Sequence, residues 1–136
     1  GQETPERVAV IRAISQLPII KAVGVTTEAD VRSGLAYYHP GMLADLVLFD
    51  AKPPAGAQMP GGHGLAFDWQ ILAAIPVDMP YMLAGGLNPG NVRECVLKTG
   101  APAVDVSSGV ETAPGEKSPE LIARFLQAVK TAKQTL

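Results

Sequence analysis

The sequence predicts an α/β fold in which parallel strands alternate with helices. Short apolar, β-branched segments alternate with amphipathic ones along the whole chain. The expected strands start near residues 18, 45, 80 and 102, which leaves between them the length of single βα units. These strands are apolar on both faces, which is typical of a parallel sheet. Two architectures satisfy this pattern, an open doubly wound sheet and a piece of a (βα)8 barrel.

The chain is expected to begin with a helix over 4–15 and a strand over 17–25. Thr4 is a suitable N-cap and Pro5 suits the first helical position. One face of the helix carries an apolar stripe of Val8, Ile11 and Ile14. The segment LPIIKAVGV that follows is short and β-branched, so we expect a buried strand there.

A second helix over 26–38 and a second strand over 44–50 follow. Thr26 or Thr27 caps the helix, and the acidic residues of its first turn favour the helix dipole. After a loop rich in proline and glycine, Asp68 is expected to cap a helix over 69–75, with Phe67 stapled onto Leu72.

The last third predicts a strand over 80–86, a helix over 88–100, a strand over 102–109 and a final helix. Ser118 caps this final helix and Pro119 occupies its first position. Its expected buried stripe consists of Leu121, Ile122, Phe125, Leu126 and Val129.

Composition narrows the class of function. The chain has 136 residues and 47% hydrophobic residues, enough for the core of one domain. Its net charge is −2 and its eleven Lys and Arg are scattered, so we expect a small-molecule substrate and neither nucleic acid nor a membrane surface. Cys95 is the sole cysteine, and no apolar signal or spanning segment is visible, which favours the cytoplasm.

Two glycine-rich loops follow the last two expected strands. The segment AGGLNPGN contains Gly85 and Gly86, and the segment DVSSGVE contains Ser107, Ser108 and Gly109. In a barrel these loops lie where phosphate groups are often bound, and their amides and hydroxyls suit an anion. The alternative is that the glycines only permit tight turns. Because two such loops converge, we favour a phosphate site and therefore the barrel.

Five motifs in this order resemble the C-terminal half of phosphoribosylanthranilate isomerase. They are IKAVGV, LVLFDAKPP, GGHGLAFDW, LAGGLNPGNV and VDVSSGVE, and the resemblance runs from about residue 1 to the end. It implies strands five to eight of a (βα)8 barrel. It also implies an enzyme of tryptophan biosynthesis that needs no cofactor or metal and converts N-(5-phosphoribosyl)anthranilate into a 1-deoxyribulose 5-phosphate product.

The resemblance assigns Asp50 as the general acid. Opening the ribose ring needs a proton on the ring oxygen, and a base must then remove the C2 proton. Apolar surroundings at the mouth of a barrel would favour the protonated carboxyl group. The alternative from the residues alone is an aspartate that caps the following turn or pairs with Lys52.

The resemblance also places other residues. Gly85 and Gly86 match the phosphate loop after strand seven, and Ser107 and Ser108 match the loop after strand eight. Asp105 matches an acid near the sugar hydroxyls, with an inward-facing structural acid as the alternative. His63 in the segment GGHG stands where the family more often has threonine, and we expect a solvated loop residue.

The general base is not expected within this chain. In the family it is a cysteine at the end of the first strand, whereas Cys95 lies in an expected helix and is interpreted as a packing thiol. An arginine and a histidine that contact the substrate would also lie upstream.

The whole chain, 1–136, is therefore interpreted as one half-barrel segment, from helix four to helix eight, that lacks its N-terminal half. Four parallel strands leave two unpaired edges, so we expect pairing with the missing half or with a second copy. Two alternative functions remain. One is a non-catalytic phosphate-binding module. The other is a different phosphosugar barrel such as indole-glycerol-phosphate synthase, which does not combine LFDAKPP with GGHGLAFDW.

Overall fold

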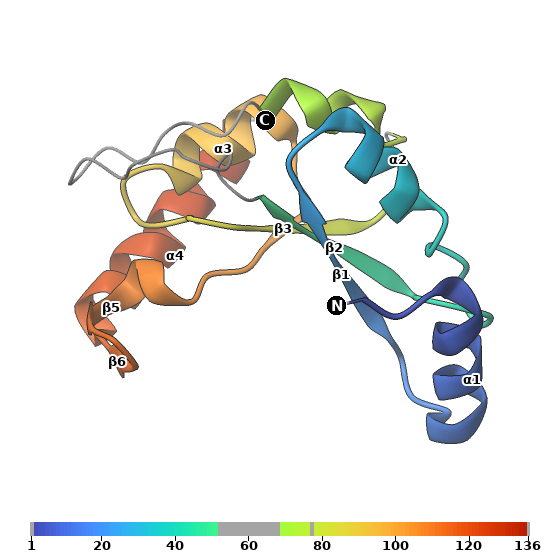
Figure 1. The fold of residues 1–136 in the computed structure, drawn as a ribbon. Coiled ribbons are helices and arrows are strands. Elements are labelled where there is room, and N and C mark those ends of the chain that lie inside the picture. The colour runs from blue at the N-terminus through green and yellow to red at the C-terminus, as the bar shows by residue number, and fades with distance from the viewer. Residues whose placement is uncertain (1, 52–68, 77, 136) are drawn as a thin grey trace.

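The computed structural model describes residues 2–51, 69–76 and 78–135. Four strands form a parallel sheet in the order β1-β2-β3-β4 (Figure 1). Their bounds are Ile20–Val25 (β1), Leu46–Ala51 (β2), Tyr81–Ala84 (β3) and Ala103–Val104 (β4). Each strand pairs with the next one along the chain, so β1 and β4 form the two edges of the described sheet. The predicted parallel α/β fold is confirmed.

Helices separate the strands along the chain. Their bounds are Pro5–Ser15 (α1), Glu28–Leu35 (α2), Trp69–Ala74 (the 3-10 helix η1), Val92–Thr99 (α3) and Pro119–Lys133 (α4). Figure 1 shows α2, η1, α3 and α4 along one side of the curved sheet, with α1 at the edge beside β1. Within the described residues, no helix is both long and apolar enough to cross a membrane.

The two faces of the sheet differ in burial. Along β2, Val47, Phe49 and Ala51 are buried, while the alternate residues Leu48 and Asp50 are only partly buried. Successive side chains of a strand point to opposite faces, so the buried set faces the helices and the other set faces the uncovered side. The strand expected to be buried over 17–25 is buried on one face only, because no described element covers the second face of the sheet.

One apolar core fills the space between the sheet and the helices. Phe49 of β2 and Leu83 of β3 are fully buried, and the ring of Phe49 meets that of Tyr81 edge-on with centroids 6.1 Å apart. From the helices, Val31 of α2 and Phe125 of α4 join the same cluster. The core thus fixes α2, α3 and α4 against one face only.

The predicted caps agree with the structure at three helices. The Thr4 hydroxyl accepts a hydrogen bond from the amide of Arg7, Thr27 forms a capping box with Asp30, and Ser118 accepts from the amide of Leu121. These side chains satisfy amides that a helix leaves without a partner. The predicted contacts of Phe67 and Asp68 lie outside the described residues.

Two predicted apolar stripes are only partly buried. In α1, Val8 is buried, but Ile11 and Ile14 are exposed; Ile14 retains 79% of its accessible surface. In α4, Phe125 is buried, while Ile122 and Leu126 are exposed at 37% and 53%. Both helices flank an edge of the sheet, so part of each stripe has no neighbour in the described chain. Amphipathic periodicity predicts which residues share a face and does not predict what covers it.

The end of the chain contains a hairpin that the sequence reasoning missed. Strands β5 (Glu111–Ala113) and β6 (Glu116–Lys117) pair antiparallel between β4 and α4. The predicted strand over 102–109 is shorter than expected, since only Ala103–Val104 joins the sheet. The chain then forms a short 3-10 turn, Ser108–Val110 (η2), before the hairpin.

Candidate functional site

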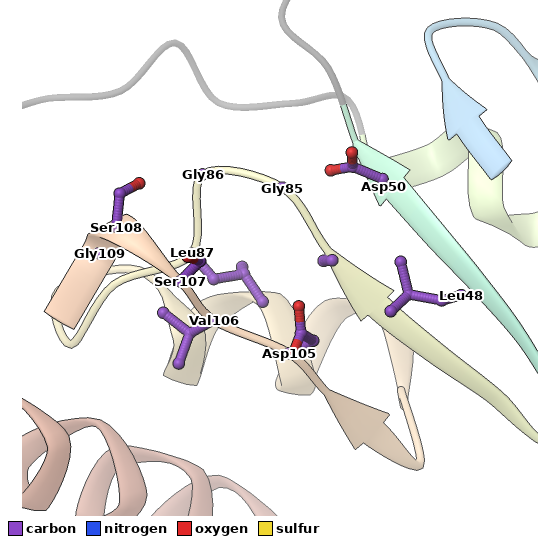
Figure 2. A pocket seen from close by; sticks show the side chains of 11 residues that line it. Leu48, Asp50, Gly85, Gly86, Leu87, Asp105, Val106, Ser107, Ser108 and Gly109 are labelled. Carbon is purple, nitrogen blue, oxygen red and sulfur yellow. The ribbon is translucent and has the colours of Figure 1, made fainter. Parts of the chain in front are cut away.

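A pocket lies at the ends of β2, β3 and β4, where strands run into their following loops (Figure 2). Its volume is about 290 Å³. All seven residues predicted for the site line it, namely Asp50, Gly85, Gly86, Asp105, Ser107, Ser108 and Gly109. Leu48, Ala84, Leu87 and Val106 complete the lining. Segments up to 61 positions apart in the sequence therefore meet at the carboxyl ends of the strands, where α/β proteins bind ligands.

Asp50 occupies the second-last position of β2 on the uncovered face of the sheet. It is half-buried, and its carboxylate makes no hydrogen bond or ion pair with another described residue. Asp45 near the start of the same segment is different, because its Oδ2 accepts from the amide of Ile19 at 2.7 Å and from Arg12. Two aspartates five residues apart thus have different surroundings, and only Asp50 is turned to the pocket. Lys52, its alternative partner, lies outside the described residues.

Gly85 closes the gap between the ends of β2 and β3. A Cβ atom there would lie 2.0 Å from the carbonyl oxygen and 2.6 Å from the nitrogen of Ala51. Gly85 also has a φ of 99°, which other residues rarely adopt. The loop after β3 can therefore approach the backbone next to Asp50 only because position 85 has no side chain.

Gly109 brings the second loop against the first. A Cβ atom at this position would lie 1.8 Å from the carbonyl oxygen of Leu87. The loop after β4 therefore packs directly on the loop after β3, and Figure 2 shows Gly109 and Ser108 across the pocket from Asp50. The pocket has a carboxylate end at Asp50 and an amide-rich end formed by the two loops.

The first turn of the second loop leaves peptide donors available. The amide of Val110 donates to the carbonyl of Ser107 at 3.4 Å, which closes the turn. The amides of Ser108 and Gly109 precede this bond and have no partner inside the turn. Backbone amides in such a concave loop are a usual way to bind an anion.

Asp105 contributes a second carboxylate to the pocket. Its amide donates to the carbonyl of Leu83 at 2.8 Å, which places it next to β3 directly after β4 ends. The side chain is exposed, and Figure 2 shows it at the same end of the sheet as Asp50. The described residues contain no group of His, Cys, Asp and Glu that could hold a metal ion.

Cys95 is not part of this site. It lies in α3, is fully buried, and belongs to the apolar core. Burial raises the pKa of its thiol to about 11, so the thiolate is scarce near neutral pH. The prediction that Cys95 is a packing thiol agrees with this burial. His63 of the glycine-rich segment lies outside the described residues.

The sequence reasoning missed Lys117 and Asn91. Neither lines the pocket, yet each donates a hydrogen bond to a loop that does: Lys117 to Ser107, and Asn91 to the carbonyl of Gly86. The turn residues Pro114 and Gly115 stand between the serines and Lys117. They indicate a turn that could bring Lys117 back to the loop of Ser107. Asn91 lies inside the helix expected over 88–100, whereas α3 begins only at Val92, so the shifted helix start hid it.

A model of the N-(5'-phosphoribosyl)anthranilate (PRA) isomerase family matches residues 1–128. Relatives named N-(5'-phosphoribosyl)anthranilate isomerase from Brucella canis and Brucella melitensis are 52% identical over 132 residues. These 132 residues are 97% of this chain and 58% of each relative. The chain therefore spans less than two thirds of the length of the curated relatives it matches.

Solved structures of phosphoribosyl anthranilate isomerases also match this chain. The phosphoribosyl anthranilate isomerase of Thermotoga maritima is 36% identical, with a TM-score of 0.72 over 96% of this chain and 59% of that one. Another isomerase structure, in complex with reduced 1-(o-carboxyphenylamino)-1-deoxyribulose 5-phosphate, is 30% identical with a TM-score of 0.68, covering 96% of this chain and 57% of that one. These structures confirm that the parallel α/β fold is of the TIM-barrel type seen in these isomerases.

Proposed function

Because the chain belongs to the N-(5'-phosphoribosyl)anthranilate isomerase family, we propose that it supplies the general acid and the phosphate site of such an enzyme. The reaction converts N-(5'-phosphoribosyl)anthranilate into 1-(2-carboxyphenylamino)-1-deoxyribulose 5-phosphate in tryptophan biosynthesis. The observation that carries the proposal is the pocket, in which Asp50 faces two amide-rich loops across one cavity. A phosphosugar has the matching polarity, with a reacting ring at one end and a dianion at the other.

Asp50 acts in the first step of the proposed mechanism. When the C1–oxygen bond of the ribose ring breaks, the ring oxygen takes the proton of the Asp50 carboxyl group, and the nitrogen lone pair forms the Schiff base. A base then removes the C2 proton; the electrons of the C2–H bond form a C1–C2 double bond, and the π electrons of the Schiff base return to nitrogen. The resulting enaminol takes a proton at C1 and loses the proton of its C2 hydroxyl, which gives the ketone. Asp105 is proposed to contact the sugar hydroxyls between the two ends. The loop amides of Ser108 and Gly109, together with the loop of Gly85 and Gly86, receive the phosphate.

The base comes from outside this chain. Cys95 is the sole cysteine of the sequence, and its burial in α3 keeps it away from the pocket. We assign the base to the part of the isomerase that precedes this segment. The 136 residues then represent helix four to helix eight and strands five to eight of the barrel. The proposed location is the cytoplasm, which agrees with the biosynthetic role of the family.

The partner of the chain is proposed to be the N-terminal half of the barrel. Its contact surface includes the uncovered face of the sheet, where Ile20 is 56% exposed, and the two edge strands. It also includes the exposed apolar residues of the flanking helices, which are Val10, Ile11 and Ile14 in α1 and Ile122 and Leu126 in α4. Parallel sheets are normally covered on both faces. A partner that touches both flanks and the inner face at once has the shape of the missing half.

The alternative function is a non-catalytic phosphate-binding module. The observation that favours it is the absence of a reactive cysteine, because the one thiol present has a pKa raised to about 11 by burial. Such a module would retain the two loops and would not need Asp50.

An isomerase assay distinguishes these functions. The loss of phosphoribosylanthranilate fluorescence is followed with the chain alone and after mixing with the N-terminal remainder of the Brucella relative. We expect activity only in the mixture, and Asp50→Asn should lower it by about 100-fold or more. Asp78→Asn, an exposed aspartate outside the pocket, is the matched control and should leave the rate unchanged. An active mixture that tolerates Asp50→Asn would refute the assigned acid, and an inactive mixture that still binds phosphate would leave the binding module.

A further inference from the structure

The β5–β6 hairpin places one lysine against the loop that follows β4. The Nζ atom of Lys117 donates to the carbonyl oxygen of Ser107 at 2.9 Å and lies 3.4 Å from its hydroxyl. It also contacts Oε1 of Glu111 at 2.6 Å. An ammonium group has three donors, and these three acceptors account for all of them. Lys117 is therefore held in one orientation by its own hairpin and by the loop.

This contact sets the direction of a peptide group that borders the pocket. Within the described residues no peptide bond is cis, so the carbonyl of Ser107 and the amide N–H of Ser108 point in opposite directions within their shared peptide plane. Lys117 holds that carbonyl and does not line the pocket, whereas Ser108 does. Fixing the carbonyl on the hairpin side turns the Ser108 amide away from the hairpin.

The loop after β3 has a corresponding arrangement. Nδ2 of Asn91 donates to the carbonyl oxygen of Gly86 at 3.0 Å, and Oδ1 of the same side chain accepts from the amide of Asn88 at 2.8 Å. Asn91 is also outside the pocket lining, while Gly86 and Leu87 belong to it. In both loops a side chain outside the pocket thus holds a carbonyl group, and the amide of the next residue belongs to the pocket lining: Asn91 holds the carbonyl before Leu87, and Lys117 holds the carbonyl before Ser108.

The charge of Lys117 is largely balanced where it stands. Glu111 is only 14% exposed in its side chain and forms an ion pair with Lys117 at 2.6 Å. The hydrogen bond from Lys117 holds the pKa of the Glu111 carboxyl below its usual range, so the carboxylate persists at neutral pH. A lysine paired in this way contributes little free charge to a phosphate, which leaves the orientation of the loop as its main effect.

We propose that Lys117, oriented by Glu111, is a positioning residue that turns the Ser108 amide into the pocket and thereby prepares the loop for a phosphate group. This role rests on the proposed phosphate site and adds a residue to it that makes no contact with the ligand. It is distinct from Asp50, which serves the other end of the pocket.

The test measures binding of inorganic phosphate to the 136-residue chain by NMR, following the amide signals of Leu87, Ser108 and Gly109. Lys117→Met removes the donors and should weaken phosphate binding by about tenfold or more, as expected when a charge-assisted hydrogen bond that orders the site is lost. Lys117→Arg keeps charge and donors and should restore affinity to within about threefold. Lys117→Gln keeps a polar side chain but lacks the ammonium group. It should weaken phosphate binding as Lys117→Met does, and it replaces that variant if methionine disturbs the hairpin.

Lys133 provides the matched control. Its Nζ donates to the carbonyl of Pro102 at 2.8 Å, so it holds the backbone just before β4 as Lys117 holds it just after. Lys133→Met makes the same change in net charge at the opposite end of the strand. We expect it to leave phosphate affinity within about twofold of the wild type, because the carbonyl that Lys133 holds belongs to Pro102, which does not line the pocket.

The possible outcomes test the phosphate site and the positioning role of Lys117 separately. Weaker binding with Lys117→Met, rescue by arginine and an unchanged Lys133→Met support the positioning role. Binding by Lys117→Met and Lys117→Gln at the wild-type level, or an equal loss with Lys133→Met, overturns that role and leaves the phosphate site intact. A wild-type chain in which phosphate moves none of the three amide signals overturns the phosphate site and the role of Lys117 together.

Discussion

Replacing Gly109 by alanine should separate the two loops that form the amide-rich end of the pocket. A Cβ atom at position 109 would lie 1.8 Å from the carbonyl oxygen of Leu87, 2.8 Å from its carbonyl carbon and 3.1 Å from Cα of Asn88. Real Cβ atoms essentially never come closer than 3.0 Å to such a neighbour, so the loops must move apart by at least the difference of 1.2 Å. All three neighbours are backbone atoms, which cannot rotate aside.

The cost follows from steric overlap alone. The φ of Gly109 is not positive, so alanine meets no penalty from the left-handed region at this position. Forcing an extra methyl group into a packed contact costs about 1–3 kcal/mol. We expect Gly109→Ala to lower the free energy of unfolding in urea by that amount. Phosphate binding should also weaken, because the Ser108 and Gly86 loops no longer face each other at the same distance.

Gly100→Ala is the matched control for this prediction. Gly100 ends α3 with a φ of 64°, and a Cβ atom added there would meet no atom within 4 Å, so alanine costs about 1–2 kcal/mol of backbone strain alone. Its loss of stability should therefore resemble that of Gly109→Ala, while phosphate binding stays unchanged. If Gly109→Ala unfolded at the wild-type urea concentration and bound phosphate with wild-type affinity, the close contact between the loops would be refuted.

Three further predictions concern other parts of the molecule. Hydrogen bonds from the Ile19 amide and then from Arg12 hold the pKa of Asp45 below its ordinary value of 3.8. The stabilisation of the folded state by the Asp45 carboxylate is therefore present above that pH and is lost as the pH falls through the folded-state pKa. Asp45→Asn should flatten this part of a stability–pH curve. Cys95 should react slowly with a disulfide reagent at pH 8 in the folded chain and quickly in denaturant, because burial raises its pKa to about 11. Leu126→Glu should leave the fold of the chain unchanged, since Leu126 is 53% exposed, but should prevent binding of the N-terminal half.

Two of these predictions have a control variant on the same chain, and the third has an outcome that would contradict it. Asp78→Asn removes an exposed carboxylate elsewhere in the chain and is the control for the change in net charge. Rapid modification of Cys95 in the folded chain would show that α3 opens or does not pack as described. Gln127→Glu adds the same charge to α4 at an exposed neighbouring position, and equal binding of the N-terminal half by the two α4 variants would argue against the apolar flank as a contact surface.

Local signals in the sequence predicted the helices and strands well. Thr4, Thr27 and Ser118 cap the helices that their positions suggested, because a cap depends on residues within one turn. The glycines of the two loops were interpreted as part of a phosphate site, with tight turns as the alternative, and Gly85 adopts a φ that favours glycine. Helix and strand bounds shifted by a few residues, and the hairpin from Glu111 to Lys117 was missed because its strands are too short for a periodic pattern.

The sequence by itself determined the alternation of strands and helices, the candidate residues of the site and, through its motifs, the family. These properties depend on neighbours along the chain and on residue types. Only the tertiary structure decided that Asp50 faces the pocket while Asp45 is bound to Arg12 and Ile19. It also decided that Lys117 reaches Ser107. The contacts of Asp45 and of the pocket join segments that are distant along the chain and that the parallel sheet brings together, whereas Lys117 reaches Ser107 through the turn of the β5–β6 hairpin.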